Sequence, residues 1–567
     1  MKHLLIISII IIITLGFGAN IIRAPKIEAV GIKETFLSVR PPVPKSLTSL
    51  DQHIIDIIPD LRSTAGTAGK NIVLAEDGHS VAVIYGRESG DPDNIMVICI
   101  AYSTDLGSTW LYYGSLSPMV RRAYSAIDAE DDFATTGLVH FAWHEATRIS
   151  GSYDSSPCFY IRETSYPDGT FYPFRFRLPN SGRRDVWTPC IGVRDSVVVI
   201  TAMNNGTYVI TYDCYIWRST DYGVTWDSGR VFLPFPQVDY APHFRFGSDG
   251  YIFFLWCKED SGGYWPYYCE SYNYGLTWTP PQLLWGNNPP YPNMSGVTCW
   301  GEYDCEVVRD TPVVVVNLSS DNSSYGETWV YYPVPESGGG WQFIGKKLVG
   351  GDSTAPQRYS RFPTIAADDY GNIFIGYQKI FETPNDTGPD CGMFIRYAGK
   401  DTWYDYGRIT FNAGALEERD LEFAHNAPVI AGGDSTLVGM IYHNAGTYPT
   451  SGNLYFDYVV VPSFPGIQES QQKSTIEQIK VYPNPFRNSV RFILPAQIGE
   501  AKILIYDVTG RLVTSHPIRV SREGRFDQPQ ATSHCFIWDG SKASPGVYFY
   551  KVESPNGKYQ GKIILTR

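Results

Sequence analysis

The chain alternates short apolar runs with polar turns, and the same unit returns along most of its length. Each unit is a pair of apolar runs separated by a few polar residues, such as Glu76-Asp77-Gly78 in the first copy and Ser248-Asp249-Gly250 in the fourth. Apolar runs joined by Asp-Gly turns are typical of β-hairpins. Seven copies are expected, over residues 72–85, 126–143, 190–203, 244–256, 307–318, 365–377 and 429–442.

An eight-residue segment follows three of these hairpins almost unchanged. S-T-D-L-G-S-T-W at 103–110 returns as S-T-D-Y-G-V-T-W at 219–226 and as S-Y-N-Y-G-L-T-W at 271–278. The Asp or Asn side chain can close a tight turn by accepting backbone N–H groups, and the glycine supplies a left-handed backbone. The Trp is expected to begin the next strand and to bury a large surface. Structural roles are therefore assigned to Asp105, Trp110, Asp221, Trp226, Asn273 and Trp278.

This segment resembles the Asp-box, or BNR repeat, of the sialidase superfamily. Weaker copies at 165–171, 322–329 and 399–403 place the expected aromatic anchors at Trp110, Phe171, Trp226, Trp278, Trp329 and Trp403. Repetition of one supersecondary unit at intervals of ~50–60 residues is typical of a β-propeller. The resemblance implies that the Asp-box turns lie on the face away from any active site.

We predict an all-β chain in which residues 25–462 form a seven-bladed β-propeller. The last hairpin is followed by one more strand-like run at 454–461 and by no box. We therefore expect a strand near Ile54–Ile58 to complete the last blade, which removes an exposed sheet edge. Six blades, as in sialidases, is the alternative, because the first or last copy could lie outside the closed circle of blades.

The N-terminus predicts export. Residues 1–24 combine Lys2 with the apolar stretch Leu4–Phe17, which is shorter than a membrane span and is typical of a secretory signal peptide. A short membrane anchor is the alternative. Export allows the ten Cys residues to oxidise. The pairs closest in sequence are Cys257 with Cys269 and Cys299 with Cys305, although buried free thiols are equally natural inside apolar runs.

The composition changes after the propeller. Residues 463–479 have the polar composition of a linker, and residues 480–567 alternate strand-like runs with Gly turns, as in a small β-sandwich. The segments Y-P-N-P-F, Y-D-V-T-G-R-L-V and G-V-Y-F-Y-K-V resemble the C-terminal sorting domain of the type IX secretion system and the Ig-like domain of flagellar hook-capping proteins. The resemblance implies a partnership with outer-membrane secretion machinery. A plain Ig-like spacer is the alternative.

Charge and aromatic content narrow the choice of partner. Residues 463–567 carry a balance of +6, whereas the remainder carries −18. An acidic propeller disfavours nucleic acid as a partner. Aromatic residues make up 14% of the chain, with 40 Tyr and 14 Trp, which suits half-buried strands and glycan-facing surfaces alike.

The candidate ligand-binding residues lie on loops that enter the first strand of each blade, and these loops converge near the axis. Arg side chains from different blades can clamp a carboxylate through paired hydrogen bonds. A Tyr beside a Glu can act as a nucleophile, as in sialidases. The fragment Ser360-Arg361-Phe362-Pro363 matches the superfamily's x-R-x-P signature in its letters, although it lies at the start of the sixth hairpin copy. The candidates are Arg122, Arg184, Tyr240, Arg361 and Glu418, and no catalytic residue is assigned.

These observations favour an exported or cell-surface propeller that binds an extracellular glycan or protein without catalysis. A sialidase-like exo-glycosidase and a structural surface or adhesion protein are the alternatives. Acidic clusters at 91–94 and 128–132 lack the ligand spacing of known calcium loops, and neither a metal nor a cofactor is predicted.

Overall fold

The described residues of the computed structural model are almost entirely β-structure. No residue among them lies in an α-helix, and no helix has the length and hydrophobicity that a membrane span requires. The structure describes residues 53–56, 69–88, 96–114, 116, 124–130, 133–135, 137–145, 147–149, 152–179, 181, 186–204, 214–231, 242–260, 262–295, 297–299, 302–319, 326–335, 341–350, 360–381, 389–410, 417–445, 453–463, 480–482, 489–494, 501–507, 511–518, 534–541, 543–554 and 557–565.

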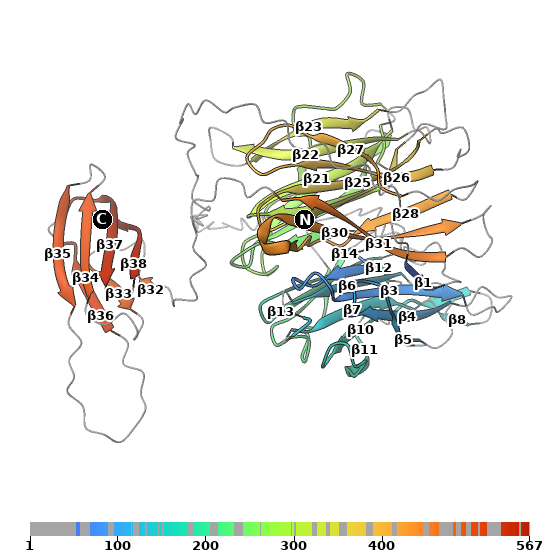
Figure 1. Ribbon diagram of the computed structural model, residues 1–567, viewed down its shortest axis with the longest axis horizontal. Coiled ribbons are helices and arrows are strands. Elements are labelled where there is room, and N and C mark those ends of the chain that lie inside the picture. Colours follow the sequence, from blue (N-terminus) through green and yellow to red (C-terminus); the bar gives the residue numbers. More distant parts are fainter. Residues whose placement is uncertain are drawn as a thin grey trace, which may run out of the picture.

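Six antiparallel sheets of four strands follow one another along the chain (Figure 1). In each sheet the strands pair in chain order, so each sheet is a simple meander. The first sheet contains β2 (Ile72–Leu74), β3 (Val81–Glu88), β4 (Met96–Ser103) and β5 (Leu111–Tyr113), and the second contains β6 (Ser125–Ala129), β7 (Val139–His144), β10 (Cys158–Glu163) and β11 (Phe171–Arg177). The third contains β12 (Val186–Arg194), β13 (Val197–Asn204), β14 (Cys214–Ser219) and β15 (Arg230–Val231), and the fourth contains β16 (His243–Phe246), β17 (Ile252–Asp260), β18 (Gly263–Ser271) and β19 (Gln282–Leu283). The fifth contains β20 (Tyr303–Val308), β21 (Thr311–Leu318), β22 (Glu327–Pro335) and β23 (Trp341–Val349), and the sixth contains β24 (Arg361–Ala367), β25 (Ile373–Ile380), β26 (Pro389–Arg396) and β27 (Tyr404–Arg408).

A further sheet, which we call the last sheet, combines strands from both ends of residues 53–463. It contains β28 (Glu417–Phe423), β30 (Ser435–Ala445) and β31 (Asn453–Pro462), and its fourth position is taken by β1 (His53–Asp56). β1 pairs antiparallel with β31, with His53 opposite Phe456. The strand expected near residues 54–58 therefore begins one residue earlier. A short additional strand, β29 (Val429–Ile430), pairs with β30 and is followed by a 3-10 turn at Ala431–Gly433. Two more short strands, β8 (Thr147–Ile149) and β9 (Ser152–Ser155), form a separate hairpin.

The first strand of each sheet is its inner strand, because these strands contact one another from sheet to sheet. Each consecutive pair of sheets also shares a cluster of buried apolar side chains. The last sheet shares such a cluster with the first, through Leu454 and Phe456 on one side and Leu74 and Val83 on the other. Figure 1 shows the last sheet, in orange, beside the first, in blue. The arrangement is propeller-like.

The three box segments, residues 103–110, 219–226 and 271–278, form the same turn between the third and fourth strands of their sheets. The Asp or Asn oxygen accepts the N–H of the Thr four residues on, at 2.8, 2.8 and 2.9 Å. The Ser hydroxyl accepts the N–H of the glycine at 2.7, 2.8 and 2.9 Å. Both central residues are left-handed, with φ of 54° at Leu106 and 84° at Gly107 in the first box. The turn is thus closed by local hydrogen bonds, and the N–H of its fourth residue also donates to the turn between the first two strands of the same sheet.

The box Trp side chains are half-buried anchors that precede the fourth strand. Trp110 packs edge to face on Phe456 of the last sheet, and Trp226 packs in the same way on Tyr160 of the second sheet. β5 begins directly after Trp110, but β15 begins four residues after Trp226. β19 likewise begins four residues after Trp278, so the expectation that the Trp begins the strand is wrong for the second and third boxes.

Two sequence expectations about element positions are wrong. The degenerate box at 322–329 falls between the second and third strands of its sheet, and Trp329 lies inside β22. The inner strand of the last sheet is β28, whereas the hairpin pattern had placed it at 429–442. β28 begins Glu-Glu-Arg-Asp, a charged run that does not look like a buried strand.

The disulfide pairing also differs from the expected one. Cys257 forms a disulfide with Cys299, which ties β17 to the segment before β20. Cys269 and Cys305, the partners expected from sequence proximity, are buried free thiols. Cysteines that are close in sequence can point to opposite sides of a strand or lie on different strands. Closeness along the chain is therefore a poor guide to disulfide pairing.

The C-terminal strands, red in Figure 1, form two small sheets. One contains β32 (Lys480–Tyr482), β33 (Ser489–Leu494) and β36 (His534–Asp539); the other has the order β35 (Leu512–Ile518), β34 (Ala501–Asp507), β37 (Gly546–Ser554) and β38 (Gly557–Leu565). One apolar cluster, which includes Phe492, Ile503 and Trp538, draws residues from both sheets.

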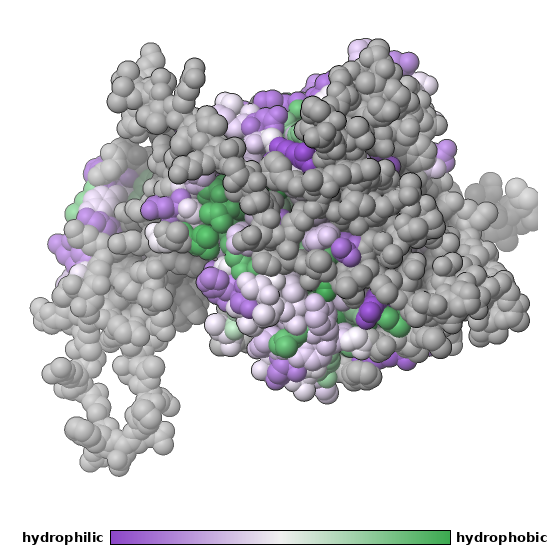
Figure 2. All heavy atoms as spheres, turned by 45° about the vertical axis from the view of Figure 1, so that its right-hand side comes forward, coloured by the Kyte–Doolittle hydropathy of each residue, from purple (hydrophilic) through white to green (hydrophobic). Residues whose placement is uncertain are grey.

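The face in Figure 2 shows hydrophobic residues as small separate groups among hydrophilic ones, in the part of the surface that belongs to described residues. Single exposed apolar side chains of this kind are normal on soluble surfaces. Exposed apolar residues at the box turns are Tyr222, Val224, Tyr272 and Leu276.

We predict that Asp221→Ala destabilises the protein by about 1–2 kcal/mol, because it removes the acceptor for the N–H and hydroxyl of Thr225. Asp221→Asn is the matched control, since the third box uses Asn273 at the same position. Chemical denaturation monitored by Trp fluorescence measures both. Equal stability of Asp221→Ala and the wild type would contradict the structural role of the turn.

Candidate functional site

The two ends of the sheets define two faces. The inner strands begin at one end, which we call the entry face. In a meander the connection between the third and fourth strands lies at the opposite end, so the box segments mark a second face, the box face. Residues that begin inner strands and residues at the boxes are therefore on opposite sides of the molecule.

Buried charged side chains meet between the inner strands. We call this group the axial cluster, and it draws on five of the sheets. Its members are Lys70, Asp128, His243, Arg245, Asp304, Glu306, Glu422 and His425. Every member except His425 is at most 6% exposed.

Lys70 joins the first sheet to the fifth and sixth. Its Nζ forms an ion pair with Asp304, and it donates to the Thr364 hydroxyl at 2.8 Å and to the Ile365 carbonyl at 3.2 Å. Thr364 itself donates to Asp304 at 3.1 Å. A buried lysine is stable only when paired and hydrogen-bonded in this way. The contact fixes the first inner strand against its counterparts across the axis.

A second set of contacts joins the remaining inner strands. His425 Nε2 lies 3.1 Å from Asp128, which also accepts the N–H of Val193 at 2.7 Å. Arg245 Nε lies 3.7 Å from Glu306, and His425 Nδ1 lies 3.9 Å from the same carboxylate oxygen. The last, second, third, fourth and fifth sheets are thus linked through polar atoms.

The carboxylates of the axial cluster have opposite pKa shifts. Burial opposes ionisation of Asp304, but the charge of Lys70 and hydrogen bonding to His243 outweigh it and hold the Asp304 pKa below its ordinary value. Burial raises the pKa of Glu422 to about 8 and also raises the pKa of Glu306. Carboxyl groups whose pKa values are shifted in opposite directions occur in acid–base centres and also in purely structural ion networks.

Three inner strands carry a β-bulge near their start, at the entry face. The pairing register shifts after Trp187, Arg361 and Arg419. The residue that follows each of them has a positive φ: 46° at Thr188, 46° at Phe362 and 55° at Asp420. Non-glycine residues in this conformation store strain, and bulges re-aim side chains at sheet ends.

Arg361 is the predicted ligand-binding residue whose side chain the structure describes. Its guanidinium forms an ion pair with Glu302, with Nε donating at 2.8 Å. Glu302 is buried and also accepts from Asn317 at 2.5 Å and from the N–H of Phe362 at 3.2 Å. This pairing holds the bulge in place, so Arg361 has a structural partner in the neighbouring sheet.

The other predicted site residues are not brought together in the described part of the chain. Arg122, Arg184 and Tyr240 lie outside the described residues. Glu418 was expected in a loop, but it lies in β28, opposite Asn444 of β30. The proposed three-arginine clamp is therefore tested only at Arg361.

A Tyr–Glu contact of the expected kind occurs at the outer part of the fifth sheet. Tyr291 donates to Glu327 at 2.6 Å, and Glu327 also accepts from Trp329 and Lys347 at 3.2 and 3.0 Å. Burial and the bond to Glu327 raise the pKa of Tyr291. The phenol is thus held in its neutral form, which is the opposite of nucleophilic activation.

An aromatic stack lies at the entry face between the second and third sheets, and none of its members is among the ligand-binding candidates predicted from the sequence. The ring of buried His144 stacks on Tyr124 and on Trp187, with centroid distances of 5.4 and 5.7 Å, and the Tyr124 and Trp187 rings lie 6.1 Å from each other, so the three rings form one cluster. The N–H of Tyr124 donates to His144 Nδ1 at 3.1 Å. Tyr124 and Trp187 are half-buried. A fixed pair of partly exposed aromatic side chains beside the axis is suited to recognition.

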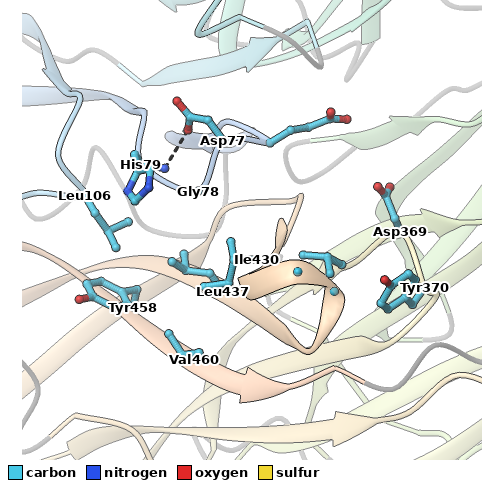
Figure 3. A pocket seen from close by; sticks show the side chains of 14 residues that line it. Asp77, Gly78, His79, Leu106, Asp369, Tyr370, Ile430, Leu437, Tyr458 and Val460 are labelled. Carbon is cyan, nitrogen blue, oxygen red and sulfur yellow. Dashed lines mark hydrogen bonds between the residues drawn. The ribbon is translucent and has the colours of Figure 1, made fainter.

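A pocket of 820 Å³ lies on the box face, where the first, sixth and last sheets meet (Figure 3). Its lining combines apolar residues with Asp77, His79 and Asp369. The sequence interpretation had placed ligand recognition on the other face. Among the described residues, no group of His, Cys, Asp or Glu side chains has the arrangement of a metal site.

Residues 480–566 match the family model of the secretion system C-terminal sorting domain. This match confirms the resemblance predicted for the C-terminal module. It indicates that the chain is exported, to the cell surface or beyond it. No curated protein matches the chain.

Several solved structures are similar to the chain. A polysaccharide lyase described as an ulvan lyase is 11% identical, with a TM-score of 0.46, covering 71% of this chain and 95% of its own. An α-L-arabinofuranosidase from Fusarium graminearum is 13% identical, with a TM-score of 0.38, covering 72% and 98%. A Trypanosoma rangeli sialidase is 9% identical, with a TM-score of 0.34, covering 90% and 87%. These similarities concern the fold and carry no site residue over to this chain.

We predict that Lys70→Met destabilises the protein by about 3–5 kcal/mol, because it leaves Asp304 ionised and buried without its cation. Replacing both partners, Lys70→Met with Asp304→Leu, is expected to recover part of this loss. Urea unfolding of the three variants measures the coupling. A double variant that is less stable than Lys70→Met alone would contradict the pairing.

We predict that Glu422→Gln becomes progressively more stable than the wild type as the pH rises from 5 to 8. The folded-state pKa of Glu422 is raised to about 8 from an ordinary value of 4.5. Its protonated form therefore favours folding below the ordinary value, and this contribution is lost as the pH rises through the folded pKa. The difference is expected to be on the order of 2–4 kcal/mol. Unfolding at several pH values measures it; a constant difference would contradict the assignment.

Proposed function

We propose that this protein is an exported β-propeller of seven blades that binds an extracellular glycan at its entry face. Residues 1–24 would be a signal peptide, 25–462 the propeller, 463–479 the linker and 480–567 an Ig-like sorting domain. Seven blades are favoured over six because every hairpin copy contributes to a separate sheet and the last sheet shares a core cluster with the first.

The observation that carries this proposal is the aromatic stack at the entry face. Trp187 follows the start of an inner strand and Tyr124 precedes the start of another, so both lie close to the axis. His144, which is fully buried, packs against both rings, and the two rings also lie against each other. Rings fixed before binding lose little conformational entropy when a sugar packs on them, and their polar atoms can hydrogen-bond its hydroxyl groups.

Binding without catalysis is favoured by the state of the charged groups. Arg361 is paired with Glu302, and Tyr291 is held neutral. The carboxylates of the axial cluster are at most 6% exposed and are engaged with neighbouring inner strands. A glycan at the entry face would meet aromatic rings before it met any of these carboxylates.

A glycoside hydrolase is the second candidate function, and one observation favours it. Asp304 and Glu422 have pKa values shifted in opposite directions within one cluster, as an acid–base pair requires. Turnover of fluorogenic glycosides by the full chain, abolished in Asp304→Asn, would favour this function over binding alone. A structural or adhesion role would instead give binding to a protein or cell surface and none to free glycans.

We predict that Trp187→Ala lowers the affinity for a glycan selected from an array by at least about tenfold, equivalent to about 1.4 kcal/mol. Titration calorimetry of the full chain measures the affinity. Tyr172→Ala is the matched control, because Tyr172 is 53% exposed on the outermost strand of the second sheet. An unchanged affinity in a folded Trp187→Ala variant would overturn the proposed site.

A further inference from the structure

The pocket on the box face is enclosed by turns of the first and sixth sheets and by the last sheet. Figure 3 shows Ile430 and Leu437 at its floor, with Leu106 and Tyr458 on one side of them and Tyr370 on the other. Its volume of 820 Å³ lies in the range of small-molecule sites, which is ~300–1,000 Å³. Because it lies on the face opposite the aromatic stack, it is separate from the proposed glycan site.

Close contacts hold the walls of this pocket in place. Gly78 of the first sheet has a φ of 70°, and a Cβ there would lie 2.7 Å from Cγ2 of Ile430. Gly433 of the last sheet has a φ of 102°, and a Cβ there would lie 2.9 Å from the Tyr370 hydroxyl. Glycine permits both the left-handed backbone and the close approach. The hollow is therefore formed before any ligand binds.

The hollow has a local cause in the sequence of the first box. Tyr274, the fourth residue of the third box, reaches the preceding sheet, where its hydroxyl donates to Asp195 at 2.7 Å. Leu106 holds the same position in the first box with nearly the same backbone, φ 54° against 55°. Leucine is shorter than tyrosine and has no hydroxyl, so the space between the turns of the first and last sheets stays open.

Apolar side chains of the last sheet remain accessible inside the hollow. Val460 is 43% exposed, and Val429 and Tyr458 are half-buried. All three line the pocket. Covering such a surface with apolar atoms removes it from water and is favourable. The floor therefore favours a ligand with an apolar body.

The charge of the rim is negative. Asp77 accepts the N–H groups of His79 and Ser80, each at 2.8 Å, and the Ser80 hydroxyl at 2.7 Å. Burial opposes ionisation of Asp77, but these hydrogen bonds outweigh it and hold its pKa below the ordinary value. Asp369 is an exposed carboxylate on a turn that Arg309 anchors by donating to the Asp369 carbonyl at 3.2 Å. Neither Lys nor Arg is among the described residues that line the pocket.

We propose that this pocket binds a small organic amine, with the ammonium group beside Asp77 and Asp369 and the apolar body on the floor. Glu76 adds a third carboxylate to the lining. An ammonium group complements this charge, and the faces of the Tyr370 and Tyr458 rings also attract cations. Carboxylates would repel an anionic ligand, and a neutral ligand would gain from the floor alone. The cavity and its floor thus make the site, and the rim selects the charge of the ligand.

The test uses the full chain and phenethylamine as the probe. Phenethyl alcohol and hydrocinnamate are the matched probes, because they keep the aromatic ring and replace the ammonium group by a neutral or an anionic one. Ligand-observed NMR titrations measure the three affinities. We expect a dissociation constant of about a millimolar for the amine and values at least about fivefold higher for the other two probes.

Two variants locate the binding. Leu106→Tyr fills the hollow and is expected to abolish amine binding, whereas Leu276→Tyr introduces the same residue at an exposed position of the third box and is expected to leave it unchanged. Asp369→Asn removes one charge from the rim and is expected to weaken binding roughly fivefold. Asp249→Asn is its control, because Asp249 is exposed on the corresponding turn of the fourth sheet. The unfolding temperature shows whether each variant is folded.

Three results would overturn the proposal. One is equal affinity for the three probes, or no measurable binding of phenethylamine. Another is undiminished amine binding in a folded Leu106→Tyr variant, because the ligand would then lie elsewhere. The third is binding of a lysine-containing peptide without binding of phenethylamine, which would assign the pocket to a protein partner.

Discussion

The contact on which the rest of the fold depends is the ion pair between Lys70 and Asp304. It crosses the axis, because Lys70 leads into the first sheet and Asp304 belongs to the fifth. Both groups are almost inaccessible to water, so neither can stay charged unless the other is in place. Local interactions can build each sheet by itself. Only the circular arrangement of all the sheets gives these charges their partners, and this selects one global arrangement of the meanders.

The parts of the fold that sequence predicts well are those that depend on neighbouring residues. The box turns could be predicted because Ser103, Asp105 and Thr109 form hydrogen bonds with groups only a few residues away. The hairpins could be predicted from apolar runs and Asp-Gly turns. The errors concern contacts between distant residues: β28 has a charged start and is nevertheless paired in the sheet with β30, and Cys257 forms its disulfide with Cys299, 42 residues away.

The candidate site was harder to predict for the same reason. Arg361 was found from its x-R-x-P context, but its partner Glu302 is 59 residues away and belongs to another sheet. No member of the axial cluster stands in a motif. A usable indication was nevertheless present, since charged residues stand among apolar ones on three inner strands, at Asp128, at Arg245, and at Asp304 and Glu306. A charge repeated at that place in several hairpins indicates a shared buried polar centre.

The use of β1 as the fourth strand of the last sheet also constrains the order of assembly. Among the described strands, β1 is the first to be synthesised, yet its partner β31 lies about four hundred residues later. Until β31 has formed, β1 has no strand to pair with, and the face of the first sheet that packs against Leu454 and Phe456 is uncovered. Unpaired strand edges associate readily with other chains. During its passage to the cell exterior, the chain must therefore shield one unpaired strand and one uncovered apolar face, and the formation of β31 provides the native neighbour of both.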